Sequence, residues 1–169
     1  MSLNTPTVAG VRRTTDGHVH SAKVSDELAT VLFALDTASL TTSAVTARIT
    51  RTIVAWAVAH GWSVRNEARV DVAARTGRQR GYMDIVIRRD GQAQDIAIEI
   101  DSAAKPWSLD KLRHAASAGM HAIWIRWGDE IWAGAYDDVD VIQLPQTRKP
   151  GSRAGTNLQQ PLWPDRARF

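Results

Sequence analysis

The sequence predicts an α/β domain in which a helix, a three-strand antiparallel meander, a crossover helix and a parallel strand follow one another. Three observations predict it. Apolar residues recur at helical spacing over residues 43–60. Apolar and polar side chains then alternate over 62–72, and two β-branched runs follow at about 81–89 and 94–101. A second helical stretch precedes the apolar run 121–127, an order that requires a right-handed crossover.

The helices of this core have recognisable ends. In the first, Val45, Ile49 and Ile53 share one face, and Gly61 is a natural stop. The crossover helix is expected from Leu109 to Ala118, with Ser108 as its cap. The turn at residues 89–92 joins the two β-branched runs into an antiparallel hairpin. Short strands near residue 131 and over 139–144 extend the sheet.

Residues outside the core form two further segments. Residues 1–42 are expected to be an N-terminal extension, irregular over 1–23, with a short helix capped at Ser25 and running to about Leu35. The core itself occupies 43–144. Residues 145–169 hold five basic side chains and one acidic one, a net charge of +4, and their Pro, Gly and Gln content predicts a flexible tail. A solubilising end and a nucleic-acid-gripping arm explain this tail equally well.

Composition narrows the class of protein. The chain of 169 residues has no cysteine, which excludes disulfides and thiolate zinc sites. No apolar run approaches 18 residues and the first residues are polar, so we expect a cytoplasmic protein without a membrane segment. The net charge is +3, and residues 65–90 hold seven arginines and only four acids. Arginine suits phosphate contacts, although a solvated strand face explains these residues equally well.

Acidic residues within the apolar strands are the most informative feature. Asp84 interrupts the first β-branched run, while Glu99 and Asp101 end the second. The hairpin lets Asp84 and Glu99 approach one another. Two carboxylates about 4 Å apart repel by roughly 4 kcal/mol at an effective dielectric constant of about 20, so the pair needs a proton, a cationic side chain or a metal ion. An ion pair with a neighbouring arginine is the alternative to a metal site.

The order of elements and these acids together resemble the PD-(D/E)XK nuclease superfamily, also called restriction-endonuclease-like. Its pattern is an acid on the second strand, then an acid, any residue and usually lysine on the third. Asp84 and the run Glu99-Ile100-Asp101 match those positions, and the resemblance covers about residues 43–127. It implies metal-dependent hydrolysis of DNA, with Mg²⁺ or Mn²⁺ held by Asp84, Glu99 and the carbonyl of Ile100. Nucleic acid, most simply DNA, is then the expected partner.

The chain departs from that pattern at the lysine, because position 101 is Asp. Asp101 is then expected to be a further metal ligand, and Lys105, four residues on, to bring its ammonium group toward the site. Other members carry an acid on the first helix, whereas residues 43–60 hold none. Glu67 on the following strand is the substitute, unless it is an exposed strand residue paired with Arg65 or Arg69.

Further candidates have simpler explanations. Lys111 and His114 share a face of the crossover helix, and a solvated face is favoured over a phosphate contact. Trp107 is expected to support the helix start or to flank a bound strand. The rival functions are a catalytically inactive DNA-binding protein of the same fold and a protein-interaction module. The sequence leaves open the mode of cleavage, DNA or RNA as substrate, and a homodimer.

Overall fold

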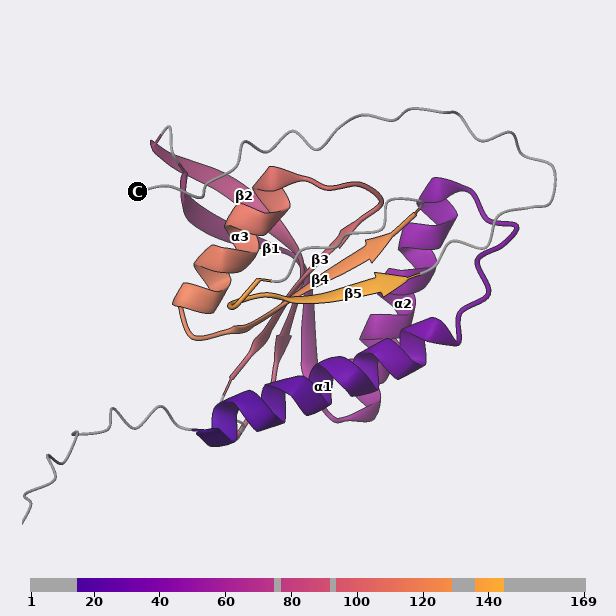
Figure 1. The fold of residues 1–169 in the computed structure, drawn as a ribbon, viewed down its shortest axis with the longest axis horizontal. Coiled ribbons are helices and arrows are strands. Elements are labelled where there is room, and N and C mark those ends of the chain that lie inside the picture. Colours follow the sequence, from indigo (N-terminus) through magenta and orange to yellow (C-terminus); the bar gives the residue numbers. More distant parts are fainter. Residues whose placement is uncertain (1–14, 75–76, 92–93, 129–135, 145–169) are drawn as a thin grey trace, which may run out of the picture.

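The computed structural model describes residues 15–74, 77–91, 94–128 and 136–144, and for residues 15–22 and 71–79 it describes the backbone alone. This part of the chain has a mixed α/β fold with one mixed sheet (Figure 1). Its elements are α1 (Thr15–Phe33), α2 (Thr42–Ala59), β1 (Ser63–Ala74), β2 (Gly77–Arg88), β3 (Ile96–Asp101), α3 (Pro106–Ser117), β4 (His121–Trp127) and β5 (Asp140–Leu144). The α/β fold class predicted from the sequence is therefore confirmed.

The sheet follows the chain order from β1 to β5. The pairs β1–β2 and β2–β3 are antiparallel, whereas β3–β4 and β4–β5 are parallel. Helix α3 connects β3 to β4, as a parallel pair requires. The hairpin and the crossover thus place the carboxyl end of β3 between an antiparallel neighbour and a parallel one.

Helix α1 differs from the prediction. Residues 15–23 were expected to be irregular, and Ser25 was expected to cap a short helix, but α1 already begins at Thr15. Ser25 lies inside the helix, where its Oγ donates to Asp140 Oδ2 at 2.6 Å and lies 3.1 Å from His121 Nε2. The serine that looked like a cap is used for a tertiary contact, which overrides the local preference. Val24, Leu28 and Leu32 belong to the same hydrophobic core as the sheet.

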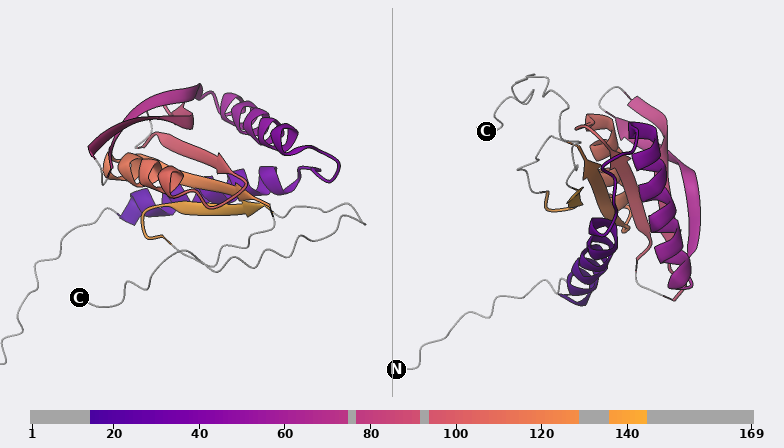
Figure 2. Two further views of the ribbon diagram at one scale, coloured as in Figure 1. Left: turned by 90° about the horizontal axis from the view of Figure 1, so that it is seen from above. Right: turned by 90° about the vertical axis from the view of Figure 1, so that its right-hand side faces the viewer.

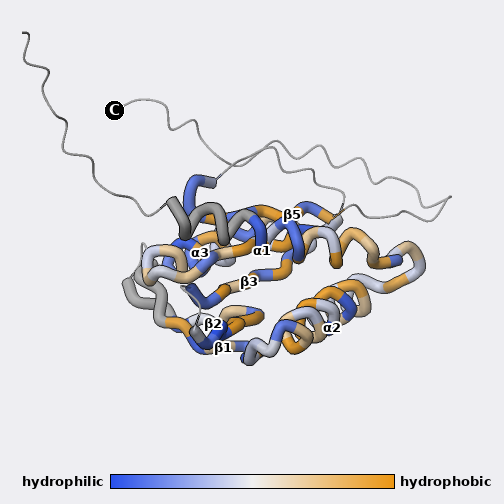
Figure 3. Tube along the Cα trace, turned by 90° about the horizontal axis from the view of Figure 1, so that it is seen from below, coloured by the Kyte–Doolittle hydropathy of each residue, from blue (hydrophilic) through white to orange (hydrophobic). Residues whose placement is uncertain are grey.

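Two hydrophobic clusters lie on opposite faces of the sheet. Helix α2 packs on β3, and helix α1 packs on α2 and β5. Together they cover Ile96, Ile98 and Ile100 of β3 in one cluster, and orange hydrophobic stretches of α2 alternate with polar ones in Figure 3. Helix α3 packs on Ala97 and on Trp124 of β4. Neighbouring residues of a strand point to opposite faces, so Glu99 and Asp101 follow Ala97 onto the α3 face.

Strands β1 and β2 form the longest pair, a curved ribbon in Figure 2. They pair from Ser63↔Arg88 to Ala74↔Gly77, whereas β2 pairs with β3 only over Ile85–Ile87. β2 was expected to begin at about residue 81 and instead begins at Gly77. Most of the ribbon therefore extends beyond the part of β2 that is paired with β3.

Helix α3 begins earlier than expected. Lys105 is its N-cap without a side-chain cap hydrogen bond, and Ser108, expected to be the cap, is a buried residue of the first turn. Pro106 explains the shift, because its fixed φ suits the first helical position. The strand over 121–127 has the predicted bounds. The expected strand near residue 131 and the basic tail over 145–169 lie outside the described residues.

Candidate active site

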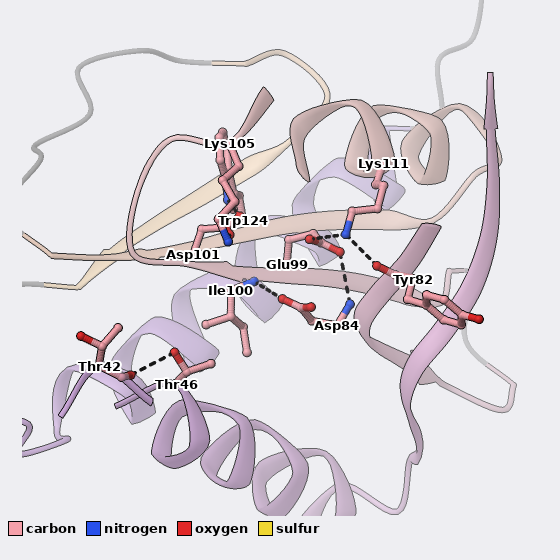
Figure 4. Close-up of polar contacts among 10 residues, drawn as sticks. All are labelled: Thr42, Thr46, Tyr82, Asp84, Glu99, Ile100, Asp101, Lys105, Lys111 and Trp124. Atoms are coloured by element: carbon pink, nitrogen blue, oxygen red, sulfur yellow. Dashed lines mark hydrogen bonds and ion pairs between the residues drawn. The ribbon is translucent and has the colours of Figure 1, made fainter. Parts of the chain in front are cut away.

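The site forms where β2 and β3 separate. Their register continues to Ile85↔Ile98, and the next opposed residues are Asp84 and Glu99. There the backbone ladder is replaced by side-chain contacts. The amide of Asp84 donates to Glu99 Oε1 at 3.2 Å, and the amide of Ile100 donates to Asp84 Oδ2 at 2.8 Å (Figure 4). Each carboxylate thus accepts an amide of the opposite strand, which holds the two acids together.

Burial makes these carboxylates poor anions. Glu99 is 2% exposed, and its pKa is raised to about 7, first by burial and then by the nearby charge of Asp84. Burial also raises the pKa of Asp84, against the lowering effects of the Ile100 amide and Lys111. A group whose charged form is disfavoured in this way gains from a cation nearby. The pair is therefore an electrostatically unsatisfied site for positive charge.

Lys111 of α3 supplies one such charge. Its Nζ lies 2.6 Å from Glu99 Oε2 and donates to the carbonyl of Tyr82 at 2.6 Å (Figure 4). Its side chain is 8% exposed, so the predicted solvated face is wrong for Lys111. The sequence held a signal for this: Lys111 adjoins Leu112 and lies three residues from Ser108 and four from Ala115, all buried. His114, the other member of the predicted face, is half-buried.

A glycine allows α3 to come this close to β2. A Cβ added at Gly81 would lie 3.0 Å from Cζ2 of Trp107 and 3.3 Å from Cδ of Lys111. Trp107, expected to support the helix start or to flank a bound strand, thus packs against the β2 backbone. The fit of Trp107 on Gly81 sets the depth at which Lys111 reaches the acids.

Asp101 forms a second pair beside the first. It is 3% exposed, its Oδ1 lies 2.7 Å from Lys105 Nζ, and its Oδ2 accepts the indole N–H of Trp124 at 3.0 Å. The ammonium group of Lys105 thus reaches back to the end of β3, as expected, although its side chain is 61% exposed. Its hydrogen bond to Asp101 raises the pKa of the ammonium group. Both oxygens of Asp101 therefore have protein partners.

Glu67 is not brought to the other acids. It lies on β1 between the pairs Asn66↔Ile85 and Ala68↔Met83, which places it opposite Asp84, but its side chain is exposed. Within the described residues its side chain makes no hydrogen bond or ion pair. Its φ of 49° is in the left-handed region, which costs a residue with a Cβ roughly 1–2 kcal/mol. The sequence held no signal for this backbone conformation.

The side chains at the site are of the chemical type that binds a hard divalent cation, but there are few of them. The described residues contain no cluster of three or more His, Asp or Glu side chains arranged to hold a metal. The carboxylates of Asp84 and Glu99 are ligands that Mg²⁺ accepts. Asp84 Oδ1 has no hydrogen-bond partner in the described part of the chain, whereas both oxygens of Glu99 have one. A cation would therefore bind first at Asp84 and share Glu99 with Lys111.

Comparisons with known proteins add little to this picture. No family model matches the chain, and no curated protein matches it. Among solved structures it is similar to a protein of unknown function, AF1548, at 11% identity and a TM-score of 0.32. The match covers 53% of this chain and 53% of that one, so the chain spans about half the length of that protein. A similarity this low does not establish a shared fold.

Among the helices of the described residues, none is both long enough and apolar enough to cross a membrane.

Proposed function

We propose that this protein is a metal-dependent nuclease that hydrolyses DNA phosphodiester bonds, with a restriction-endonuclease-like core. The observation that carries the proposal is the pair of buried carboxylates, Asp84 and Glu99, at the point where β2 and β3 separate. Their raised pKa values indicate a place that favours added positive charge. The match of these residues to the superfamily pattern supports the same assignment.

Asp84 and Glu99 would hold Mg²⁺ or Mn²⁺ together with the carbonyl of Ile100, whereas Asp101, expected from the sequence as a further ligand, has both oxygens engaged by Lys105 and Trp124. Such an ion, when bound, supplies charge that neutralises a phosphate and activates water. Asp84 Oδ1 is the carboxylate oxygen left open for it. Glu99, fixed by the Asp84 amide and by Lys111, is held in one orientation. Preorganised ligands of this kind need little rearrangement when charge develops on the substrate.

Lys111 takes the part for which the superfamily uses the lysine after the second acid. Its ammonium group arrives from α3 and not from β3, yet it contacts the carboxylate of Glu99. In that position it stabilises a nearby phosphate oxyanion and balances the negative charge of the two acids. Asp101 and Lys105 form a separate pair, which holds the end of β3 against Trp124.

One observation favours the second candidate, a catalytically inactive protein of this fold that binds DNA or a protein partner. Both oxygens of Glu99 and both oxygens of Asp101 are engaged by protein groups. A buried ion pair that is already complete has less to gain from a metal ion. The two candidates differ in whether added Mg²⁺ produces turnover.

Cleavage assays separate these functions. Plasmid, linear duplex and single-stranded DNA are incubated with Mg²⁺ or Mn²⁺ and with the wild type, Asp84→Ala, Glu99→Ala, Lys111→Met and the exposed control Asp110→Asn. We expect cleavage by the wild type and the control, and a loss of at least 100-fold in the other variants, the lower range for removing one charge-stabilising group. Undiminished cleavage by both acid variants would overturn the proposal.

The same assay identifies the rivals. If the wild type cleaves nothing yet binds DNA in a salt-sensitive manner, the inactive DNA-binding protein is the correct reading. If it neither cleaves nor binds, the chain is a protein-interaction module with structural acids.

A further inference from the structure

An exposed tyrosine lies next to the candidate site without a packing role. Tyr82 is 61% exposed, while the next residue of β2, Met83, is fully buried. Within the described residues its hydroxyl group has no hydrogen-bond partner, while its carbonyl oxygen accepts from Lys111. Figure 4 shows the ring pointing away from the Glu99–Lys111 pair, on the other side of the strand. The residue therefore joins the acid pair, through its backbone, to an open aromatic face.

The strand register places arginines beside this ring. Arg69 of β1 is the direct cross-strand partner of Tyr82, and Arg80 lies two residues before it on the same face of β2. Both arginines are exposed. Asp71, the cross-strand partner of Arg80, is the one acid in the sequence between residues 69 and 82. Directly paired residues lie about 5 Å apart and alternate residues of one strand about 7 Å apart, so the ring and both guanidinium groups are within reach of one ligand.

The position of the ring along β2 links it to the acids. Asp84 is two residues further along the strand, roughly 7 Å in backbone rise. The ribbon is free of β3 here, because β2 pairs with β3 only from Ile85 onward. A chain that stacks on the ring can therefore reach the Asp84–Glu99 pair only around this unpaired edge of β2, because the ring points away from the pair.

We propose that Tyr82 is a stacking platform for an unpaired base of single-stranded nucleic acid, with Arg69 and Arg80 contacting its backbone beside the acid pair. The proposal rests on the proposed nuclease function for the fate of that strand, and on the surface alone for binding. An aromatic ring presents its face to any base, but bases of an intact duplex are already stacked on each other. The surface therefore prefers single strands to duplexes.

Binding can be measured without turnover. Fluorescence anisotropy in EDTA is recorded with a labelled single-stranded DNA, the same sequence as RNA, and the matched DNA duplex. Tyr82→Ala is expected to weaken single-strand binding by roughly 5- to 150-fold, the span that stacking of one base gives. Tyr82→Phe keeps the ring and is expected to bind within about 2-fold of the wild type. Tyr82→Leu keeps apolar bulk without the π face and should resemble Tyr82→Ala.

Two controls define the specificity of the effect. Phe33→Ala removes an aromatic that is 56% exposed at the end of α1 and is expected to leave binding unchanged. Arg80→Gln is expected to reduce the slope of log affinity against log salt by about 0.7, the value for one contact to a single-stranded backbone, whereas Tyr82→Ala should leave that slope unchanged. Thermal unfolding of each variant verifies that it is folded.

The outcomes separate this inference from the nuclease function. The platform is overturned if Tyr82→Ala binds single strands as the wild type does, if duplex binding falls by the same factor, or if no nucleic acid binds. If the protein cleaves DNA but its binding of single strands does not depend on Tyr82, the stacking platform is wrong and the nuclease function stands. Binding that depends on Tyr82 without cleavage in any metal removes the nuclease and leaves the platform.

Discussion

Two lysine–carboxylate pairs stand side by side at the end of β3, and their environments differ sharply. Glu99–Lys111 and Asp101–Lys105 have nearly equal N–O distances, 2.6 and 2.7 Å. The two acids are equally buried, at 2% and 3% exposed, but Lys111 is 8% exposed and Lys105 61%. A contact distance alone therefore does not reveal what a pair contributes. Water can replace Lys105, whereas it cannot reach Lys111 in the same way.

The difference also separates structure from function. Asp101 is satisfied by Trp124 and Lys105, and it holds the end of β3 to β4. Glu99 keeps a raised pKa despite Lys111, because burial and Asp84 outweigh the ammonium group. Perturbed groups of this kind concentrate at functional sites. The Glu99 pair is thus the candidate for chemistry and the Asp101 pair the structural one.

The largest expected effect breaks the comparison directly. At pH 8, Lys111→Ala should lower the free energy of unfolding by roughly 3–5 kcal/mol, because it leaves Glu99 buried without its counter-charge. Lys105→Ala, the matched variant, should cost less than about 1 kcal/mol, since water solvates the freed carboxylate oxygen. Urea titrations of both variants measure this. Equal losses would show that the difference in lysine exposure is irrelevant to stability.

The next effect is on the pH dependence of stability. The pKa of Glu99 is about 7 in the folded protein against an ordinary 4.5, so the folded chain binds this proton more tightly than the unfolded chain does. The free energy of unfolding contributed by Glu99 is therefore highest below pH 4.5 and falls as the pH rises to about 7. Glu99→Gln should flatten this fall, because glutamine does not titrate and because the variant removes the negative charge next to Asp84. Urea midpoints between pH 5 and 8 measure it, and an unchanged slope in the variant would contradict the assignment.

A smaller effect tests the comparison of the two pairs by disturbing Lys111 and leaving Lys105 in place. Gly81→Ala places a Cβ against Trp107 and Lys111 and should cost roughly 1–3 kcal/mol, the usual range for overpacking. Urea titration measures this loss of stability, and the DNA cleavage proposed above should fall with it. The double variant with Trp107→Phe, which removes the crowded Cζ2 atom, should recover most of the stability. Failure of this rescue would show that the packing of Trp107 on Gly81 does not set the position of α3.

The smallest effect concerns the backbone opposite Asp84. Glu67→Gly should raise the free energy of unfolding by up to about 1 kcal/mol, because glycine tolerates a φ of 49°. Glu67→Ala keeps the Cβ and should bring no gain. Since Glu67 contacts neither acid, cleavage should be unchanged in both variants. A loss of cleavage in Glu67→Ala would restore Glu67 as a functional acid.

The sequence determined the α/β class, most of the strands and the adjacency of Asp84 and Glu99, because these depend on local periodicity and on one short hairpin. It erred at α1, where Ser25 contacts Asp140 and His121, residues more than 90 positions away. It erred again at Lys111, because the depth of a helical lysine depends on how closely the helix packs. Only the tertiary structure decided that contact, since Gly81 lets α3 approach β2 and brings Lys111 into Glu99.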